Sequence, residues 1–306
     1  MKNIFVFSFL TALSVGCSSP TQNQANEIES SQSWAMRDFI KVDSINPILE
    51  PSPNQLFTNP INNQTTGWEE RNVLNPSAVV RNGKVYMIYR AQDEQMTSRL
   101  GLAISDDGLH FTKQPSPIFY PDKDSMEAYE WPGGVEDPRV VESDDGTYIM
   151  TYTSYDGKVA RLCLASSKDL QTWTKHGLVI TGKYTDMWSK SGAIVCQLVG
   201  DKVIATKVDG KYWMYFGDTN LYLATSDDLV HWEVEEGVET KKMIPVLYPR
   251  PGYFDSRLVE PGPYALLQDA GILLIYNGSN SPNYNDPELP KFTYAAGQAL
   301  FDKEKP

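Results

Sequence analysis

The chain has 306 residues, a formal net charge of −12 and an aromatic content of 11%. This acidic balance argues against nucleic acid as a partner, because binding to a polyanion depends on Lys and Arg that neutralise phosphates. A neutral sugar polymer is compatible with the charge, and the 7 Trp, 17 Tyr and 11 Phe supply aromatic faces that pack against sugar rings. We therefore expect a carbohydrate partner and no nucleic-acid partner.

Residues 1–17 have the pattern of a bacterial lipoprotein signal peptide. Lys2 precedes an apolar run over residues 4–13, which is too short to cross a membrane, and small residues precede Cys17. We predict cleavage before Cys17, lipidation of Cys17, and export to the periplasmic face or the surface of a bacterial cell. The alternative is an ordinary signal peptide in which Cys17 has no role. Residues 18–33 are mostly polar and are predicted to be a flexible tether.

A motif of the form Ser-x-Asp-Leu/Gly-x-x-Trp/Phe recurs in the remaining domain, residues 34–306. Its copies begin at Ser105, Ser167 and Ser226, so the period is roughly sixty residues, which is typical of a repeat architecture. Each copy follows an aromatic segment that alternates like a β-strand. These segments are residues 85–90, 147–152 and 211–216, and a fourth lies at 272–276.

Each repeat has the sequence of an antiparallel unit with an inner strand, a turn, the aromatic strand and a third strand. Turns are predicted at Asn82-Gly83, Asp145-Gly146 and Asp209-Gly210, which are favoured hairpin sequences. The inner strands are predicted at residues 77–80, 139–142, 193–196 and 264–267, and the third strands at 100–104, 161–165 and 221–225. Helical periodicity is nearly absent.

These units, repeated radially, predict an all-β five-bladed β-propeller. A β-sandwich of unrelated strands is the competing interpretation, but it would not produce motif copies at one period. The fourth repeat begins near Val259 and the sequence stops at Pro306, so we expect the last blade to be largely missing. A strand near residues 39–42 is expected to supply part of the closure.

Cysteine and histidine chemistry find little support in the sequence. Cys163 and Cys196 each lie in an apolar strand-like run, so two buried thiols are expected, with a disulfide as the alternative. His110 and His231 occupy the same place in the repeated turn, which is an outer structural position. We therefore expect no metal site, no Ser-His-Asp triad and no cofactor. Gly133-Gly134 is interpreted as a flexible turn.

Acidic residues occur where a propeller would form an axial pocket, just before the inner strands. Asp137 precedes a proline before one inner strand, and Glu260 lies in a similar position before another. Asp218 follows the aromatic strand of the third repeat. Glycoside hydrolysis needs two carboxyl groups, and these three acids could supply them. The alternative for each is an ordinary turn or solvated loop residue.

Several segments of the chain resemble glycoside hydrolase family 130, and the resemblance covers about residues 34–306. The most specific part is Glu136-Asp137-Pro138-Arg139. The other matching segments are Asn75-Pro-Ser-Ala-Val, Tyr89-Arg-Ala, Ser226-Asp-Asp-Leu-Val-His-Trp, Glu260-Pro-Gly-Pro and Leu274-Ile-Tyr-Asn-Gly. The family contains β-mannoside phosphorylases and β-1,2-mannosidases on five-bladed propellers. The resemblance implies that Asp137 is the catalytic acid, which in the phosphorylases acts through a sugar hydroxyl.

Phosphate attack needs clustered cations. The family's phosphorylases have a His where this chain has Asn277 and an Arg where it has Gly217-Asp218. Asp218 and Glu260 correspond to the acid pair of the family's hydrolases, although the first is usually Glu there. The resemblance therefore implies an inverting β-mannosidase, with β-1,2 linkages as the expected preference. Lys190 keeps a positive charge at the site, so a β-mannoside phosphorylase that releases mannose 1-phosphate is the alternative.

We expect Asp218 and Glu260 to activate water, and Asp137 to act as the acid or to hold the non-reducing mannose. Other polar residues near the predicted pocket are expected to bind sugar hydroxyls. These are Asn75, Arg90, Arg139, Lys190 and Asn277. A third hypothesis, from a different class, is an inactive glycan-binding lipoprotein, which the expected missing blade motivates. The oligomeric state is left open.

Overall fold

The structure is a computed structural model that describes residues 34–37, 39–282 and 289–306. Asp38–Pro306 form one compact unit, and the described residues before it belong to a separate unit. The predicted signal peptide, the lipidation site Cys17 and the tether over residues 18–33 lie outside the described residues. Among the residues that are described, no helix is long and apolar enough to span a membrane.

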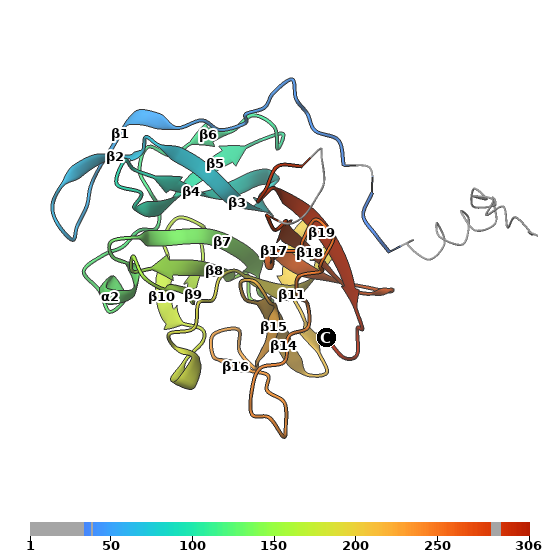
Figure 1. Cartoon of the computed structure of the whole chain (residues 1–306). Helices are drawn as coiled ribbons and strands as arrows, with labels where there is room; N and C mark the ends of the chain where they lie inside the picture. The colour runs from blue at the N-terminus through green and yellow to red at the C-terminus, as the bar shows by residue number, and fades with distance from the viewer. Residues whose placement is uncertain (1–33, 38, 283–288) are drawn as a thin grey trace, which may run out of the picture. The chain divides into compact units, whose positions relative to one another are not determined.

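Nearly all regular structure in the compact unit is β-strand, as Figure 1 shows. The described residues contain one short α-helix, α2 (Glu127–Glu130), and one 3-10 turn, η1 (Gly182–Tyr184). The prediction of an all-β domain with almost no helix is therefore confirmed.

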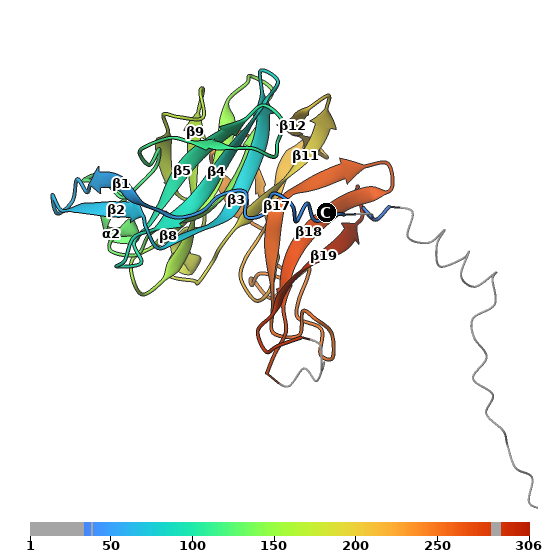
Figure 2. The ribbon, with the colours of Figure 1, turned by 90° about the horizontal axis from the view of Figure 1, so that it is seen from above.

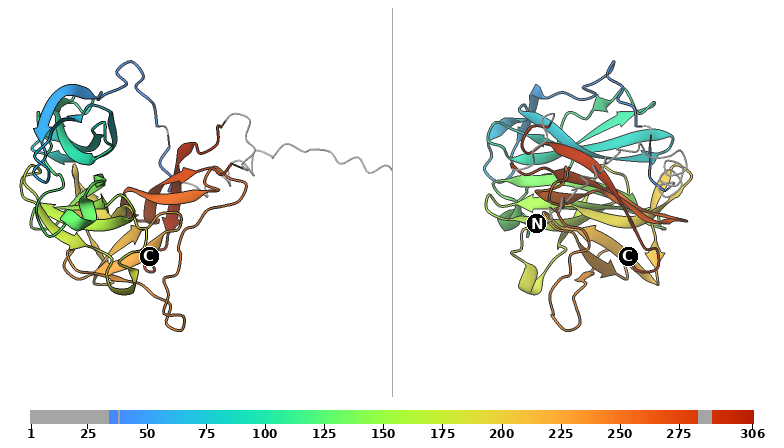
Figure 3. Two further views of the ribbon diagram at one scale, coloured as in Figure 1. Left: turned by 60° about the vertical axis from the view of Figure 1, so that its left-hand side comes forward. Right: turned by 45° about the vertical axis from the view of Figure 1, so that its right-hand side comes forward.

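Four antiparallel units follow one another within the described residues, and the blue-to-red colouring traces them around an arc in the left view of Figure 3. Figure 2 shows the same strands from above. The first unit contains β3 (Asn72–Arg81), β4 (Lys84–Gln92), β5 (Ser98–Ser105) and β6 (Thr112–Lys113). The second contains β7 (Gly134–Glu142), β8 (Tyr148–Tyr155), β9 (Ala160–Ser167) and β10 (Thr174–Leu178).

The third unit contains β11 (Gly192–Val199), β12 (Lys202–Ala205), β13 (Lys207–Val208), β14 (Lys211–Phe216), β15 (Tyr222–Ser226) and β16 (Trp232–Val234). The fourth contains β17 (Leu258–Gln268), β18 (Gly271–Ser279) and β19 (Tyr294–Phe301). The predicted inner, aromatic and third strands all fall on these elements, so the propeller-like repeat is confirmed. Five blades with the last one missing stays a prediction.

Successive units touch through short parallel pairings. β11 pairs with β17 at Val195 and Cys196, and β12 pairs with β7 at a single residue. Apolar side chains fill the spaces between neighbouring units: one core cluster includes Leu100, Met150 and Tyr152 from the first two units. Burial of such side chains is the main stabilising term, at about 25 cal/mol per Å² of apolar surface. The cores thereby fix the inner strands side by side.

The repeated Ser-x-Asp motif forms the same tight turn in each of the first three units. The Ser105 hydroxyl accepts the backbone N–H of Gly108 at 2.9 Å, and the equivalent bonds to Ser167 and Ser226 are 2.8 and 2.9 Å. The residues that donate these bonds have positive φ. They are Gly108, Leu170 and Leu229. The motif therefore forms a local turn that ends the third strand of each unit. This explains why the period of the motif matches the period of the structural repeat.

One detail of the predicted strands is wrong: residues 39–42 form no strand, and Phe39 and Ile40 are exposed. The first described strand is instead β1 (Ser52–Thr58), which within the described residues pairs with β2 (Thr65–Glu69). The three predicted turns are confirmed. Asn82-Gly83 and Asp209-Gly210 have positive φ at both residues, and Asp145-Gly146 lies in the turn between β7 and β8, where Gly146 N donates to the Ser143 carbonyl at 2.9 Å.

Cys163 and Cys196 are both buried and both free, which confirms the expected thiols and excludes the disulfide between them.

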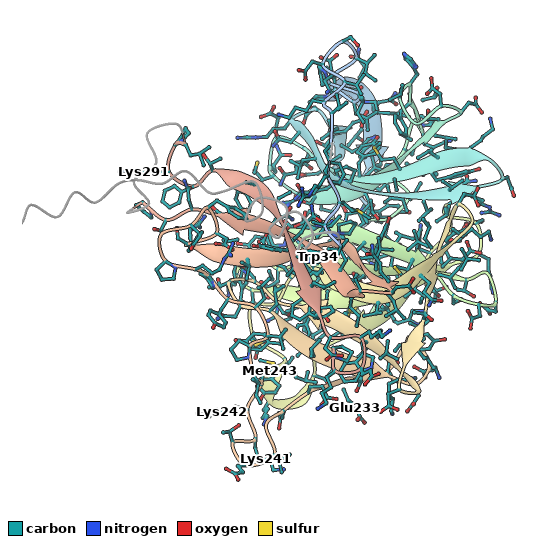
Figure 4. The ribbon with its side chains drawn as sticks, turned by 90° about the vertical axis from the view of Figure 1, so that its right-hand side faces the viewer. Trp34, Glu233, Lys241, Lys242, Met243 and Lys291 are labelled. Carbon is teal, nitrogen blue, oxygen red and sulfur yellow. The ribbon has the colours of Figure 1, made fainter. Side chains whose placement is uncertain are left out.

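The loop between β16 and β17 that carries Lys241 and Lys242 projects beyond the strands, as Figure 4 shows. The Lys183 ammonium donates to the Lys241 carbonyl at 2.6 Å and stabilises this loop.

Candidate active site

The inner strands of the first two units are interrupted at the same place. The β3–β4 ladder skips Asn75 and Pro76, and the β7–β8 ladder skips Asp137 and Pro138. Asn75 and Asp137 have φ values of 48° and 50°, and Ser191, directly before β11, has a φ of 44°. Such values cost free energy in a residue other than glycine, although Asn and Asp tolerate them best. The segments around Asn75, Asp137 and Ser191 therefore share a backbone kink.

Asp137 is 6% exposed and is held by partners from the first unit. Its Oδ1 accepts hydrogen bonds from Asn75 Nδ2 at 2.7 Å and from Arg90 Nη1 at 3.1 Å. Burial, the largest single influence, raises its pKa, but neighbouring donors and cations outweigh burial and hold the pKa below its ordinary value. These neighbours are Arg90, Arg139, Asn75 and Lys190. Asp137 is therefore a fixed, ionised acceptor in the free site.

Glu136 joins the same network, although the sequence analysis did not select it. Arg90 Nη2 donates to Glu136 Oε1 at 2.6 Å while its Nη1 reaches Asp137. Adjacent residues of a regular strand face opposite sides, so the kink at Asp137 is what allows one guanidinium to reach both carboxylates. Burial raises the pKa of Glu136, Arg90 opposes this rise, and Asp137 adds to it. Its place in the Glu136-Asp137-Pro138-Arg139 motif was the sequence signal for it.

Gly134 lets the first and second units approach each other closely next to these acids. Its φ is 104°, and a Cβ at this position would lie 2.1 Å from the carbonyl oxygen of Ser98. Ser98 N donates to the Gly133 carbonyl at 2.9 Å, and Ser98 Oγ donates to Glu136 at 3.3 Å. The interpretation of Gly133-Gly134 as a flexible turn is therefore wrong, because Gly134 begins β7 and is a tight contact between two units.

Arg139 and Lys190 connect this network to the fourth unit. Arg139 is buried, and its Nε donates to the Gly262 carbonyl at 2.9 Å while Nη1 donates to the Pro138 carbonyl at 2.8 Å. Burial lowers the pKa of Lys190, but the surrounding carboxylates raise it above its ordinary value in sum. These are Asp137, Glu260, Glu136 and Asp218. Lys190 is thus the shared counter-ion of the acids that the sequence analysis selected.

A pocket of about 450 Å³ contains Asp218, Glu260 and Lys190 together. Its remaining wall is partly aromatic, with Trp188 and Tyr294 each about half exposed. Trp188 Nε1 donates to Asp218 Oδ2 at 2.6 Å. Arg257, Leu258 and Thr219 complete the lining. Trp188, Tyr294 and Arg257 were missed by the sequence analysis, because no motif contains them and only the fold brings them to the acids.

Glu260 is the acid of this pocket that titrates near neutrality. Burial raises its pKa to about 7, Asp218 and Asp137 add to the rise, and Lys190 and Arg139 oppose it. A carboxyl group of this kind exchanges protons readily at physiological pH, as general acid–base catalysis requires. Tyr294 lies in the same field: burial and then Glu260 raise the pKa of its phenol.

The structure therefore brings nearly all predicted site residues into one connected region. Asn277 lies opposite Glu260 in the β17–β18 ladder, so its place beside the pocket follows from strand register. The lipidation candidate Cys17 lies outside the described residues. His110 and His231 bind the aspartates of their own turns at 2.7 Å and are exposed, in the outer positions predicted. Within the described part of the chain, no group of three or more His, Cys, Asp or Glu side chains could hold a metal ion.

A larger hollow of about 670 Å³ lies between residues 114–125 and the start of β10. Lys175 lines it and is paired with Asp124 at 2.9 Å and with buried Glu130. None of the predicted site residues lines this hollow. Size alone does not indicate chemistry, so we place the candidate active site at the smaller pocket, where Glu260, whose pKa is raised, meets Asp218 and Lys190.

A propeller-like β fold with paired carboxyl groups in an aromatic-walled pocket defines a carbohydrate-active enzyme of the glycosidase class. The sequence model of glycoside hydrolase family 130, described as beta-1,4-mannooligosaccharide phosphorylase, matches residues 40–305. The chain belongs to this family.

Relatives of known sequence and structure agree with this membership. A 1,2-beta-oligomannan phosphorylase of Thermoanaerobacter sp. is 30% identical over 78% of this chain and 72% of its own length. Phosphorylases of Listeria innocua and Ruminococcus albus are 24% and 23% identical, and the chain spans 50% and 61% of their lengths.

Solved structures extend the similarity to the fold. A glycosyl hydrolase from Bacteroides ovatus is 42% identical, with a TM-score of 0.86 over 89% of this chain and 79% of that one. A structure from work on family 130 glycoside hydrolases that target beta-1,2 mannosidic linkages in Candida mannan is 40% identical, with a TM-score of 0.87 over 90% of this chain and 79% of that one. The curated relatives support the phosphorylase alternative of the sequence analysis better than its hydrolase prediction.

Proposed function

We propose that this chain hydrolyses β-mannosides, with a preference for β-1,2 linkages, and releases the non-reducing mannose with inversion. The observation that carries the proposal is the meeting of Asp218 and Glu260 in one pocket, with Lys190 as their shared counter-ion. Two carboxyl groups on either side of a glycosidic bond are what an inverting glycosidase requires.

The charge of the pocket favours water over phosphate as the attacking group. Phosphate recognition needs cations that are free to pair with it. Lys190 lies in the electrostatic field of four carboxylates, and the pKa of Glu260 stays near 7 in spite of Lys190. Because burial and neighbouring carboxylates already disfavour the charge on Glu260, a further anion at this place is unfavourable. The similarity to a structure from work on hydrolases supports the same choice.

A β-mannoside phosphorylase is the second candidate, and two observations favour it. The curated relatives that match this chain are all phosphorylases. In addition, Arg257 lines the pocket together with Lys190, so two cationic side chains reach the same space. Mannose 1-phosphate would then be the product in place of mannose.

The proposed reaction uses one proton that the site holds at Glu260 below about pH 7. As substrate binds, this proton passes to Asp137, which protonates the linkage oxygen by way of a mannose hydroxyl, as the family resemblance implies. Ionised Glu260, with Asp218, then takes a proton from the attacking water, so the site regains the proton that it lost. The predicted polar residues hold the mannose hydroxyls. These are Asn75, Arg90, Arg139, Lys190 and Asn277.

The test is incubation of the purified protein with β-1,2-mannobiose, with and without inorganic phosphate, and product analysis by NMR. Hydrolysis gives two mannose molecules without phosphate. The mannose released from the non-reducing end has the α configuration when it is first formed. Mannose 1-phosphate formed only in the presence of phosphate would establish the second candidate instead. Binding without any cleavage would favour the inactive glycan-binding protein.

The exported, lipid-anchored location is a further part of the proposal and rests on residues 1–17 of the sequence. Metabolic labelling with a palmitate analogue would test it: incorporation that is lost in Cys17→Ala supports the anchor, and labelling of both forms contradicts it.

A further inference from the structure

We infer that Trp188 is a positioning residue for Asp218, an inference that rests on the proposed function and deepens it. Trp188 Nε1 donates to Asp218 Oδ2 at 2.6 Å. The other carboxylate oxygen, Oδ1, receives only a long contact of 3.4 Å from Thr219 Oγ1 among the described residues. The indole therefore fixes one oxygen of Asp218 and leaves the other available for the attacking water.

Asp218 needs an external partner because its own backbone does not fix its side chain. It follows β14 on a sharp corner, between Gly217 with a φ of 135° and Thr219 with a φ of 75°. Its side chain is only partly buried, and no strand ladder orders residue 218. A carboxylate on such a corner samples several rotamers unless a hydrogen bond selects one.

Trp188 is itself held firmly by the second unit. Arg161 Nε donates to the Thr185 carbonyl at 3.1 Å, and Arg161 Nη2 donates to Asp186 at 2.8 Å. Directly after Trp188, Ser189 N donates to the Ala160 carbonyl at 2.9 Å. The Tyr155 ring packs edge-on against the indole, with ring centroids 6.1 Å apart. The Trp188 segment is thus fixed by β8 and β9, and its indole N–H holds the carboxylate of Asp218, which belongs to the third unit.

The segment that carries Trp188 also fixes the counter-ion, so the two parts of the pocket are coupled. Gly217 N donates to the Lys190 carbonyl at 3.1 Å, and Lys190 Nζ lies 5.8 Å from the centroid of the Trp188 ring. Residues 188–190 therefore meet residues 217–218 through one backbone and one side-chain hydrogen bond. Loss of the indole donor would release Asp218 but leave the backbone bond in place.

The test is Trp188→Phe, which keeps an aromatic wall in the pocket and removes only the donor. We expect kcat on β-1,2-mannobiose to fall by roughly 10- to 100-fold, because a small displacement of a catalytic group has effects of this size, while KM stays within about twofold. Trp213→Phe is the matched control, because Trp213 Nε1 donates to the Val208 carbonyl at 3.0 Å, outside the pocket, and its loss should leave kcat unchanged.

An NMR signature separates positioning from a merely structural role. A short hydrogen bond to a carboxylate moves the indole N–H resonance downfield, so Trp188→Phe should remove one such signal, and Asp218→Asn should shift that signal upfield with Trp188 intact. Wild-type kcat in Trp188→Phe, an equal loss in Trp213→Phe, or an indole signal that Asp218→Asn does not move would each overturn the inference. Full activity of Asp218→Asn would instead refute the role of Asp218 in the proposed function, and the indole shift would still report the contact.

Discussion

The two halves of the candidate site are built in different ways. Asp137 lies in the half made by the first two units, where it is buried and already bonded to Asn75 and Arg90. Asp218 and Glu260 lie in the half made by the third and fourth units, where they line an open pocket. The first half is ordered before substrate arrives, which lowers the cost of binding a sugar. The second half keeps a titratable group and room for a small reactant, which suits the chemical step.

The strongest way to break this comparison is Asp137→Asn. The amide keeps the shape but removes the charge that Arg90 holds, so we expect kcat/KM to fall about 10³- to 10⁴-fold. Asp106→Asn is the control, since its carboxylate is 82% exposed and lies in a surface turn. Rates are measured by mannose release, with thermal melts to confirm folding. Near-normal activity in Asp137→Asn would show that the buried half has only a structural role.

Glu260→Gln tests the other half. Loss of the group that titrates near neutrality should lower kcat about 10²- to 10³-fold and should flatten the dependence of the residual rate on pH around 7. Glu94→Gln, on the surface with its side chain 62% exposed, should leave kcat within twofold of wild type. If Glu260→Gln retained the wild-type pH dependence, Glu260 would be excluded as the titrating group.

Gly134→Ala tests whether the two halves depend on close packing between units. The added Cβ would lie 2.1 Å from the Ser98 carbonyl oxygen, at a φ of 104°. Gly83→Ala is the matched control, because Gly83 has a φ of 72° but nothing within 4 Å of the added Cβ. We expect Gly134→Ala to lower the free energy of unfolding by about 2–3 kcal/mol more than Gly83→Ala. If chemical denaturation showed equal losses of unfolding free energy in the two variants, the neighbouring backbone would have moved to relieve the clash at no cost in stability.

The smallest expected effect is the pH dependence of the wild-type protein, which tests the half of the site that contains Glu260. Because the pKa of Glu260 is raised to about 7, the free site holds its proton below this pH and loses it above. We expect kcat/KM to fall as pH rises through about 7 and to decrease about tenfold for each further unit. A rise of kcat/KM through the same range would mean that ionised Glu260 alone acts, without the proton transfer to Asp137.

Much of the fold was predictable because its signals are local. The turns at Ser105, Ser167 and Ser226 close through bonds between residues three apart, so their sequence and their geometry go together. The breaks in the strand ladders at Asn75 and Asp137 also had a local signal, since each residue is followed by a proline, which has no backbone N–H to donate to a ladder. Local sequence therefore located the strands and one side of the site.

The remaining contacts were not predictable, because they join distant segments. Arg139 binds the carbonyl of Gly262, and Trp188 binds Asp218, through pairs of residues that no motif relates. Gly134 looked like a turn because its partner, Ser98, belongs to another unit. Residues 39–42 looked like a strand because their apolar pattern is local, but among the described residues no strand pairs with them. The aromatic wall of the pocket is therefore a property of tertiary structure alone.

The shared backbone kink has a consequence for mutagenesis of the site. Asn75, Asp137 and Ser191 all adopt the left-handed conformation, in three successive units. Because Asn, Asp and Gly tolerate this region of φ best, a β-branched replacement at any of the three would strain the main chain as well as remove the polar group. Substitutions at these positions therefore report backbone strain together with the loss of the side chain.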